Sequence, residues 1–469
     1  MESIWMADTI IRKREPLLGD MEVPVAVIGA GLAGILTAYY LKQEGIRAVV
    51  LEADRIGGGQ TKNTTAKITS QHGQIYGRLI GTYGRQMAKH YAQANEDAIG
   101  EYEKLIREKE IECDFVRCPA FLYSRKEEKS LKREAEAAGE LGIRASFTTD
   151  SELPFPVAGA VRFERQARFH PLKFLARIAE EVEVYEETKV LSVAGTGVET
   201  ARGRVTAENI VFASHFPFIN VPGYYFARMH QERSYVVALE GAENMEGMYL
   251  GIDADGLSFR PQGEFLLIGG GNHRTGLNKS ALKEQKSAAR EQTARFGECG
   301  CRYEMLRRRA EEYYPGCREA ACWSAQDCMT LDGLPYIGRF SRRNPGWFVA
   351  AGFGKWGMTT SMVSARILSA VIGGRTCPEA DIFSPQRRFT AYAAKGLAVH
   401  GAYTVKGLAK HILPSGNKRI VPNCPHMGCR LEWNPDEKSY DCPCHGSRFD
   451  GEGRLMDGPA QIDCKRREE

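Results

Sequence analysis

A glycine-rich turn near the N-terminus constrains the fold more than any other feature of the sequence. Val23 to Ile28 is a mostly apolar run rich in β-branched residues, and it leads directly into the turn Gly29 to Gly34. Residues 35–41 continue with apolar side chains at helical spacing, and a second apolar run over 48–51 ends at Glu52. The order of strand, glycine turn, helix, strand and acidic residue predicts a βαβ unit with a parallel sheet.

The spacing of the glycines and of the acidic residue matches the fingerprint of a dinucleotide-binding turn. Gly29 permits the tight turn, Gly31 lets the backbone approach a pyrophosphate, and Gly34 lets the helix pack on the strand. The helix start offers unpaired N–H groups to the phosphates, and Glu52 is expected to accept hydrogen bonds from ribose hydroxyls. The alternative is a packing turn in another α/β unit, but strand, helix and acid are all in place, which favours nucleotide binding.

NAD and FAD both use this fingerprint. After Glu52 the sequence continues with Gly57-Gly58-Gly59-Gln60-Thr61 and a polar segment that reaches His72, where a simple NAD domain would proceed to another crossover helix. This insertion favours FAD. The residues expected to contact FAD in this part of the chain are Gly29, Gly31, Gly34, Glu52, Gly58 and Thr61.

Two short motifs near the C-terminus combine cysteine with histidine. Cys424 and His426 follow the pattern C-x-H, Cys442 and His445 follow C-x-x-H, and fifteen residues separate the motifs. Each motif supplies one thiolate and one imidazole, which suits a [2Fe-2S] cluster with two cysteines on one iron and two histidines on the other. Structural zinc is the alternative, but zinc fingers usually pair cysteine with cysteine and histidine with histidine.

The two motifs and their surroundings resemble Rieske proteins. In many members of that family two further cysteines bridge the ligand loops, and the resemblance implies a disulfide between Cys429 and Cys444. Gly458-Pro459-Ala460 resembles the proline loop that covers the cluster in this family. Few residues between 413 and 423 can supply the first strands of the usual base sheet, so the domain is expected to be abbreviated.

A second resemblance covers residues 20–375. The segment from Asp332 to Gly338 reads Asp-Gly-Leu-Pro-Tyr-Ile-Gly, and Gly352 to Met358 forms a late glycine-rich turn before a helix that reaches about residue 372. Together with the first fingerprint, these segments resemble the D-amino-acid oxidase family of FAD enzymes in content and order. The resemblance implies that Gly354, Gly357 and Met358 lie near the isoalloxazine, where a helix N-terminus stabilises the anionic reduced flavin.

The composition bounds the class of protein. With 43% hydrophobic and 26% charged residues, the chain is typical of a globular protein and not of a disordered or coiled-coil one. A net charge of +4 over 469 residues predicts no nucleic-acid surface, and no apolar run approaches the roughly 20 residues of a membrane span. Without an apolar stretch near the N-terminus, the protein is expected to be cytoplasmic.

The expected fold class is an α/β FAD-binding domain of the Rossmann-like type with an interleaved α+β substrate domain, followed by a small all-β Rieske domain. FAD-binding segments are expected over 1–80, 161–230 and 324–375, substrate-domain segments over 81–160 and 231–323, a helical linker over 376–412 and the Rieske domain over 413–469. A charged helical region is expected over 282–310. Gly269-Gly270-Gly271 lacks a following GxxG and helix, and is interpreted as a loop.

These features predict an FAD-dependent oxidoreductase that dehydrogenates an amine or amino-acid-like small molecule and passes electrons from flavin to the cluster, with an external electron acceptor or donor as partner. The alternative is a non-catalytic redox carrier or sensor. A Rieske oxygenase is disfavoured because no iron site of two histidines and a carboxylate follows the cluster motif.

The sequence assigns no catalytic residue. His72, His170, His215 and Lys355 lie in or beside the family-like segments, but a single histidine is more often a hydrogen-bonded structural residue.

Overall fold

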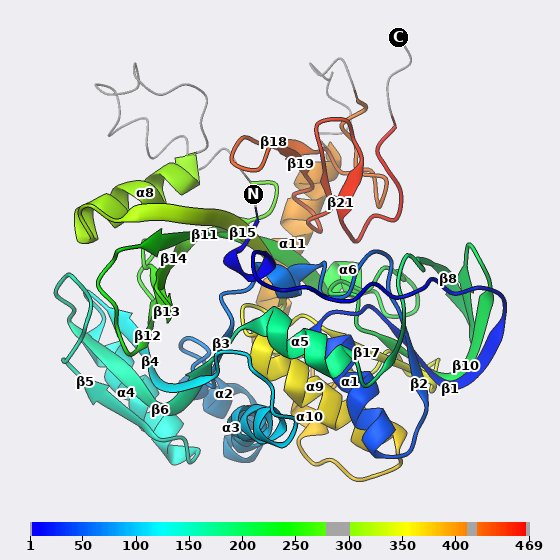
Figure 1. The fold of residues 1–469 in the computed structure, drawn as a ribbon, viewed down its shortest axis with the longest axis horizontal. Coiled ribbons are helices and arrows are strands. Elements are labelled where there is room, and N and C mark those ends of the chain that lie inside the picture. Colours follow the sequence, from blue (N-terminus) through cyan, green and yellow to red (C-terminus); the bar gives the residue numbers. More distant parts are fainter. Residues whose placement is uncertain (1, 278–300, 410–419, 466–469) are drawn as a thin grey trace.

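The computed structural model of the chain describes residues 2–277, 301–409 and 420–465. Their strands form three sheets, of eight, nine and four strands (Figure 1). In Figure 1 the eight-stranded sheet lies to the right, the nine-stranded sheet to the left, and the four-stranded sheet above β11 and β15 of the second sheet. The expected fold class is confirmed.

The first sheet contains the fingerprint. β1 pairs in parallel with β2 on one side and with β10 on the other. Its last four residues are all buried, as is typical of a parallel strand covered on both faces. The strand order is β16-β17-β10-β1-β2-β7, with β8 and β9 added beside β10. The strands are β1 (Met21–Ile28), β2 (Ala48–Leu51), β7 (Glu183–Tyr185), β8 (Val190–Ala194), β9 (Gly197–Thr200), β10 (Arg204–Phe212), β16 (Tyr336–Arg339) and β17 (Trp347–Ala351).

The second sheet has the order β15-β11-β14-β13-β12-β4-β6-β3, with β5 beside β6. Most neighbours in it are antiparallel, and β12 and β4 are parallel. Its strands are β3 (Lys67–Ile68), β4 (Val116–Ser124), β5 (Ala145–Thr148), β6 (Gly159–Arg168), β11 (Met229–Glu240), β12 (Met248–Gly251), β13 (Ser258–Gln262), β14 (Phe265–Arg274) and β15 (Arg318–Thr330).

Helices cover the first sheet and connect the two large sheets. α1 and α9 pack on each other, and their buried faces join the main hydrophobic core. The helices are η1 (Ile4–Met6), α1 (Leu32–Gln43), η2 (Gln60–Asn63), α2 (Tyr76–Tyr83), α3 (Arg85–Glu108), α4 (Glu128–Glu140), α5 (Pro171–Ala179), α6 (Tyr225–Arg228), α8 (Cys301–Tyr313), α9 (Gly357–Ile372), α10 (Ala380–Phe383) and α11 (Ala391–Ala409).

One expected loop and three expected domain boundaries differ from the structure. The triglycine at 269–271 is not a loop but lies within β14, where Gly269 and Gly270 pair with β11 and form part of a cavity wall. The domain boundaries expected at 160/161, 230/231 and 323/324 fall inside β6, β11 and β15, and each of these strands belongs whole to the second sheet because its hydrogen-bond ladder continues across the boundary. Of the charged helical region, residues 282–300 lie outside the described residues and α8 is the described part.

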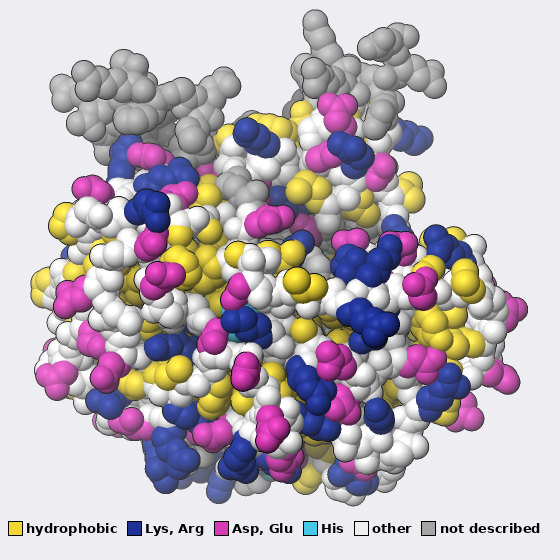
Figure 2. Space-filling view, in the orientation of Figure 1, with side chains coloured by type: hydrophobic (Ala, Val, Ile, Leu, Met, Phe, Trp, Pro, Cys, Tyr) yellow, Lys and Arg dark blue, Asp and Glu magenta, His cyan; other side chains and the backbone are white. Residues whose placement is uncertain are grey.

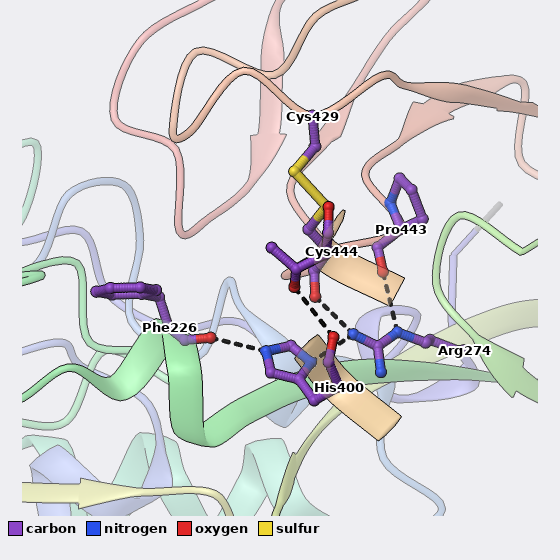
Figure 3. Close-up of a disulfide and its surroundings, with 7 residues drawn as sticks. Phe226, Arg274, His400, Cys429, Pro443 and Cys444 are labelled. Atoms are coloured by element: carbon purple, nitrogen blue, oxygen red, sulfur yellow. Dashed lines mark hydrogen bonds between the residues drawn. A yellow bond between two sulfur atoms is a disulfide. The ribbon is translucent and has the colours of Figure 1, made fainter. Parts of the chain in front are cut away.

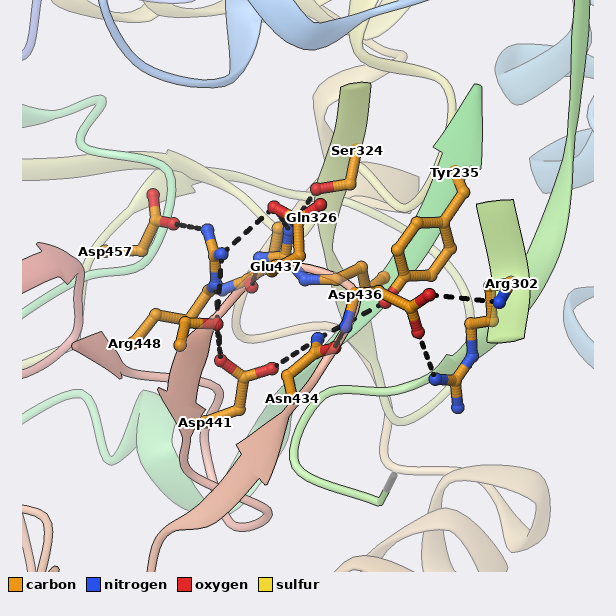
Figure 4. A network of polar contacts seen from close by, with 12 residues as sticks. Tyr235, Arg302, Ser324, Gln326, Asn434, Asp436, Glu437, Asp441, Arg448 and Asp457 are labelled. Carbon is orange, nitrogen blue, oxygen red and sulfur yellow. Dashed lines mark hydrogen bonds and ion pairs between the residues drawn. The ribbon is translucent and has the colours of Figure 1, made fainter. Parts of the chain in front are cut away.

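The third sheet is held against the second by buried ions. Its strands are β18 (Glu432–Asn434), β19 (Ser439–Asp441), β20 (Arg448–Phe449) and β21 (Leu455–Asp457). Figure 4 shows Arg448 within a polar network, between Asp457 and Asp441. Its guanidinium nitrogens lie 2.8 Å from Asp457 and 3.2 Å from Glu437. Glu437 also accepts a hydrogen bond from Tyr303 of α8 at 2.8 Å, and α8 packs on β11 and β14. The network therefore crosses from the small C-terminal domain, residues 420–465, to the second sheet.

Charges are mixed over the face in Figure 2, where Lys and Arg alternate with Asp and Glu. Among the described helices, none is long and apolar enough to cross a bilayer.

The segment after α10 is anchored by a buried ion pair. Arg387 donates to both carboxylate oxygens of Asp332, at 2.7 and 2.6 Å, and to the carbonyl oxygens of Leu334 and Pro335. Burial alone would raise the pKa of Asp332, but the charge and hydrogen bonds of Arg387 lower it to about 2. The Asp332 carboxylate is therefore ionised in the folded protein wherever pH exceeds that value.

Asp332→Ala is expected to lower the free energy of unfolding by about 3–5 kcal/mol, because it leaves a buried guanidinium without its carboxylate. In the wild type the stabilisation from ionised Asp332 beside Arg387 is fully present above the ordinary carboxyl pKa near 4, and it is lost as pH falls towards 2. Urea unfolding of the two proteins at neutral and acid pH measures both effects. As control, Glu140→Ala removes an exposed ion pair with Arg85 and should lower the free energy of unfolding by at most about 1 kcal/mol. Equal losses of stability in the two variants at neutral pH would contradict the account.

Candidate functional site

A cavity of about 490 Å³ is lined by residues from all three sheets and from the loops that connect their strands. The fingerprint turn with Gly29 and Gly31 forms part of the lining, and β11, β14 and β15 form another part. Residues 458–461, which belong to the small domain, complete the lining. The volume is within the range of about 300–1,000 Å³ that small-molecule and cofactor sites occupy.

The fingerprint glycines are each constrained by a neighbour. A Cβ on Gly29, whose φ is +107°, would lie 2.8 Å from the carbonyl oxygen of Ala213, and a Cβ on Gly34 would lie 1.9 Å from that of Gly29. At Gly31 a Cβ would meet only Thr61 Oγ1, at 3.4 Å. Gly34 therefore serves the packing of α1, whereas a larger side chain at Gly31 would extend into the cavity.

Glu52 and Thr61 hold the turn from the side. Glu52 lines the cavity and accepts hydrogen bonds from the backbone N–H of Ala30 at 2.7 Å and of Asp54 at 2.9 Å. Burial raises the pKa of Glu52, and these bonds oppose the rise. A carboxylate has about four acceptor positions, so two remain for ligand hydroxyls. Thr61 Oγ1 accepts from the N–H of Leu32 at 3.1 Å and fixes the start of α1.

The late glycine turn meets the same cavity. Gly354, Gly357 and Met358 line it at the start of α9, where the N-terminus of the helix faces the lining residues. Gly58 does not line the cavity: its N–H donates to the carbonyl oxygen of Arg55 at 2.9 Å, so it closes a turn behind the wall that Gly59 to Thr61 form.

The four expected cluster ligands come together in the small domain. Cys424, Cys442 and His445 are buried, and the rings of His426 and His445 lie 4.9 Å apart. Neither nitrogen of His445 has a hydrogen-bond partner, and Nδ1 of His426 has none. Buried polar atoms without partners are costly, so these nitrogens fit a metal centre, which would use their lone pairs.

A disulfide and an arginine brace the ligand loops. Cys429 and Cys444 form the expected disulfide, which confirms that inference (Figure 3). Figure 3 shows Arg274 of β14 beside it, where the guanidinium donates to the carbonyl oxygens of Pro443 at 2.9 Å and Cys444 at 2.8 Å. The loop that carries two expected ligands is therefore fixed by the second sheet.

Two buried glutamines hold the same loop on its other side. Gln231 Nε2 donates to the carbonyl oxygens of His445 at 2.8 Å and Gly458 at 2.9 Å. Gln326 Nε2 donates to the carbonyl oxygen of Gly446 at 2.8 Å and to Gln231 Oε1 at 2.7 Å. Gly446 has φ +88°, and a Cβ there would lie 2.5 Å from Gln231, so the close approach requires glycine.

Two of the four catalytic candidates lie outside the cavity. Both ring nitrogens of His72 are engaged, with Tyr91 and Thr69, and burial lowers its pKa to about 3. His170 caps α5 and contacts Asp8 at 2.9 Å. These two histidines have structural roles.

The other two candidates line the cavity. Nε2 of His215 has no hydrogen-bond partner, and Nζ of Lys355 lies 3.4 Å from Glu232.

Two cavity residues were missed by the sequence reasoning. Asp327 of β15 lines the wall, and desolvation raises its pKa to about 7 although Lys355 opposes the rise. Lys67 of β3 also lines the wall, and desolvation followed by the charge of Arg260 lowers its pKa to about 7. Lys67 belongs to the polar insertion after Glu52, which was the available signal, whereas Asp327 lies in a strand with no distinguishing motif.

Comparisons with known proteins identify the families of both parts of the chain. A family model described as FAD dependent oxidoreductase matches residues 24–371. The chain belongs to this family of FAD-dependent oxidoreductases. A second model, the Rieske [2Fe-2S] domain, matches residues 417–466. The protein YhfW of Bacillus subtilis (strain 168), named as a Rieske 2Fe-2S iron-sulfur protein, is 33% identical over 98% of this chain and 96% of its own length.

Solved structures show the same fold for the flavoprotein part. Glycine oxidase from Geobacillus kaustophilus has a TM-score of 0.63 at 18% identity and covers 78% of this chain and 99% of its own. L-amino acid deaminase from Proteus vulgaris has a TM-score of 0.61 at 15% identity and covers 80% and 100%. This FAD-dependent oxidoreductase therefore carries two redox groups, FAD and a Rieske [2Fe-2S] cluster.

Gly31→Val is expected to abolish FAD retention and leave the cluster intact, because the new side chain would occupy the cavity beside the fingerprint backbone. FAD and iron content of the purified protein measure this. Gly100→Val is the control, since Gly100 lies on α3 with open space around it. If the Gly31 variant kept the FAD content of the wild type, the fingerprint would be a packing turn and not an FAD-binding site.

His445→Ala is expected to remove the iron and to leave FAD bound, because it deletes one proposed ligand in a domain separate from the fingerprint. The wild type should contain two irons and acid-labile sulfide in each chain. His90→Ala, on α3, is the matched control. Stoichiometric zinc without sulfide in anaerobically purified wild-type protein would refute the ligand assignment.

Proposed function

We propose that the protein dehydrogenates an amine or amino-acid-like small molecule and that the electrons pass within the same chain from flavin to the Rieske cluster. In this proposal FAD contacts Gly29, Gly31, Glu52, Thr61, Gly354, Gly357 and Met358, while Gly34 and Gly58 shape the backbone around it. Cys424, His426, Cys442 and His445 hold the cluster. Bound FAD supplies the two-electron acceptor for the substrate.

The observation that carries the proposal is the shared wall of the cavity. Residues 458–461 of the small domain line the same space as the fingerprint glycines. Phe216 also lines it, and its ring meets the ring of His445 edge to face at 6.5 Å. The flavin cavity and a cluster ligand are therefore separated by one aromatic side chain.

The stoichiometry requires a further partner. Dehydrogenation removes two electrons from the substrate, and a [2Fe-2S] cluster carries one at a time, so each turnover includes two successive transfers. An external acceptor must therefore oxidise the cluster twice for each substrate molecule.

The cavity lining offers two groups for proton handling. Lys67 Nζ donates to the carbonyl oxygen of Tyr249 at 3.0 Å and to Ser258 Oγ, and its pKa of about 7 leaves a fraction of the amine neutral at neutral pH. Asp327, with a pKa also near 7, lies on β15 in the same lining. Either Lys67 Nζ or an Asp327 oxygen can accept a proton from a substrate amine, because each is partly in its basic form near pH 7.

The names of the structural relatives support the substrate class. Glycine oxidase and L-amino acid deaminase share the fold of the residues that surround this cavity, and both are named for amino-acid substrates.

Anaerobic titration with amines, imino acids and amino acids tests the proposal. One of these substrates should bleach the flavin and, in the same sample, produce the electron paramagnetic resonance signal of a reduced Rieske cluster. His445→Ala should still bleach but give no cluster signal. Flavin bleaching with a cluster that stays oxidised in the wild type would contradict transfer to the cluster.

A further inference from the structure

One short segment of the flavoprotein part contacts both histidines expected to hold the cluster. Phe216 meets the ring of His445, and Asn220, four residues later, lies with Oδ1 2.9 Å from Nε2 of His426. Residues 214–216 of this segment also line the flavin cavity. The contact of Asn220 with His426 joins residues 206 positions apart in the sequence.

The hydrogen bond determines which nitrogen of His426 carries the proton. If Nε2 donates to the amide oxygen of Asn220, Nδ1 has a free lone pair, as a metal ligand requires. In the opposite tautomer Nδ1 would carry a buried N–H, and that atom has no hydrogen-bond partner in the structure. The cost of an unsatisfied buried donor therefore favours the tautomer in which Nδ1 faces the cluster.

We infer that Asn220 is a positioning residue for the cluster: it fixes His426 with Nδ1 towards the iron and tunes the reduction potential from the flavoprotein side. This inference rests on the cluster ligands of the proposed function and not on its substrate. An acceptor on Nε2–H makes the imidazole a stronger electron donor, which stabilises the oxidised cluster and lowers the potential.

Two variants separate this role from simple packing. Asn220→Ala removes the acceptor and should raise the midpoint potential of the cluster. Asn220→Asp keeps the shape and offers a charged, stronger acceptor, so it should lower the potential. Potentiometric titration with dithionite, followed by electron paramagnetic resonance, measures both without a substrate. Pulsed measurements should show a changed nitrogen coupling for one of the two histidines in each variant.

Asn209→Asp is the charge control. Asn209 lies on β10, which pairs with β1, β9 and β17, and its variant adds the same charge without contacting His426. It should leave the potential and the nitrogen couplings as in the wild type.

Opposite shifts in the two Asn220 variants support the inference, as does loss of iron in Asn220→Ala with iron retained in Asn220→Asp. Unchanged potentials, shifts of the same sign, or loss of iron from both variants would overturn it. Because dithionite supplies the electrons, failure to find a reducing substrate would count against the proposed function alone.

Discussion

The position of the cluster relative to the flavin cavity depends on one pair of buried amides. Gln231 and Gln326, on neighbouring strands of the second sheet, bond to each other and to backbone carbonyl oxygens in the small domain. The amide of Gln231 donates to the carbonyl oxygens of His445 and of Gly458 in the proline loop, and the amide of Gln326 donates to that of Gly446. Because a buried amide that loses its acceptor is costly, displacement of the small domain would leave several unpaired donors at once.

This docking gives the two redox sites a common boundary. The loop at 458–461 lines the flavin cavity, while the segment after β10 places Phe216 against the ring of one proposed ligand, His445, and Asn220 against the other, His426. Arg274 adds a half-buried positive charge beside the ligand loop, and a positive charge favours the more negative, reduced cluster. With the proposed ligands, the flavoprotein part would both position the cluster and contribute to its potential.

Local sequence patterns predict the parts of this arrangement that depend on near neighbours. The turn from Gly29 to Gly34 and the late turn at Gly352 to Met358 carry their own conformational requirements, and both appear as expected. The pattern failed at Gly269 to Gly271, because three glycines suggest a loop when the neighbouring strands that pair with them are unknown.

Contacts between distant segments could not be predicted. Asn220 reaches His426 only after three sheets have assembled, and nothing in its local sequence distinguishes it from an ordinary loop residue. The same holds for Asp327, whose pKa is raised by desolvation in the assembled cavity.

The central claim is that electrons move between flavin and cluster inside one chain. Anaerobic photoreduction of the flavin, with the cluster initially oxidised and both absorbances followed in time, tests it without a substrate. The account predicts that the cluster is reduced as the flavin is reoxidised, with a first-order rate that does not change with protein concentration. A rate proportional to protein concentration, or a reduced flavin beside a cluster that stays oxidised, would contradict it.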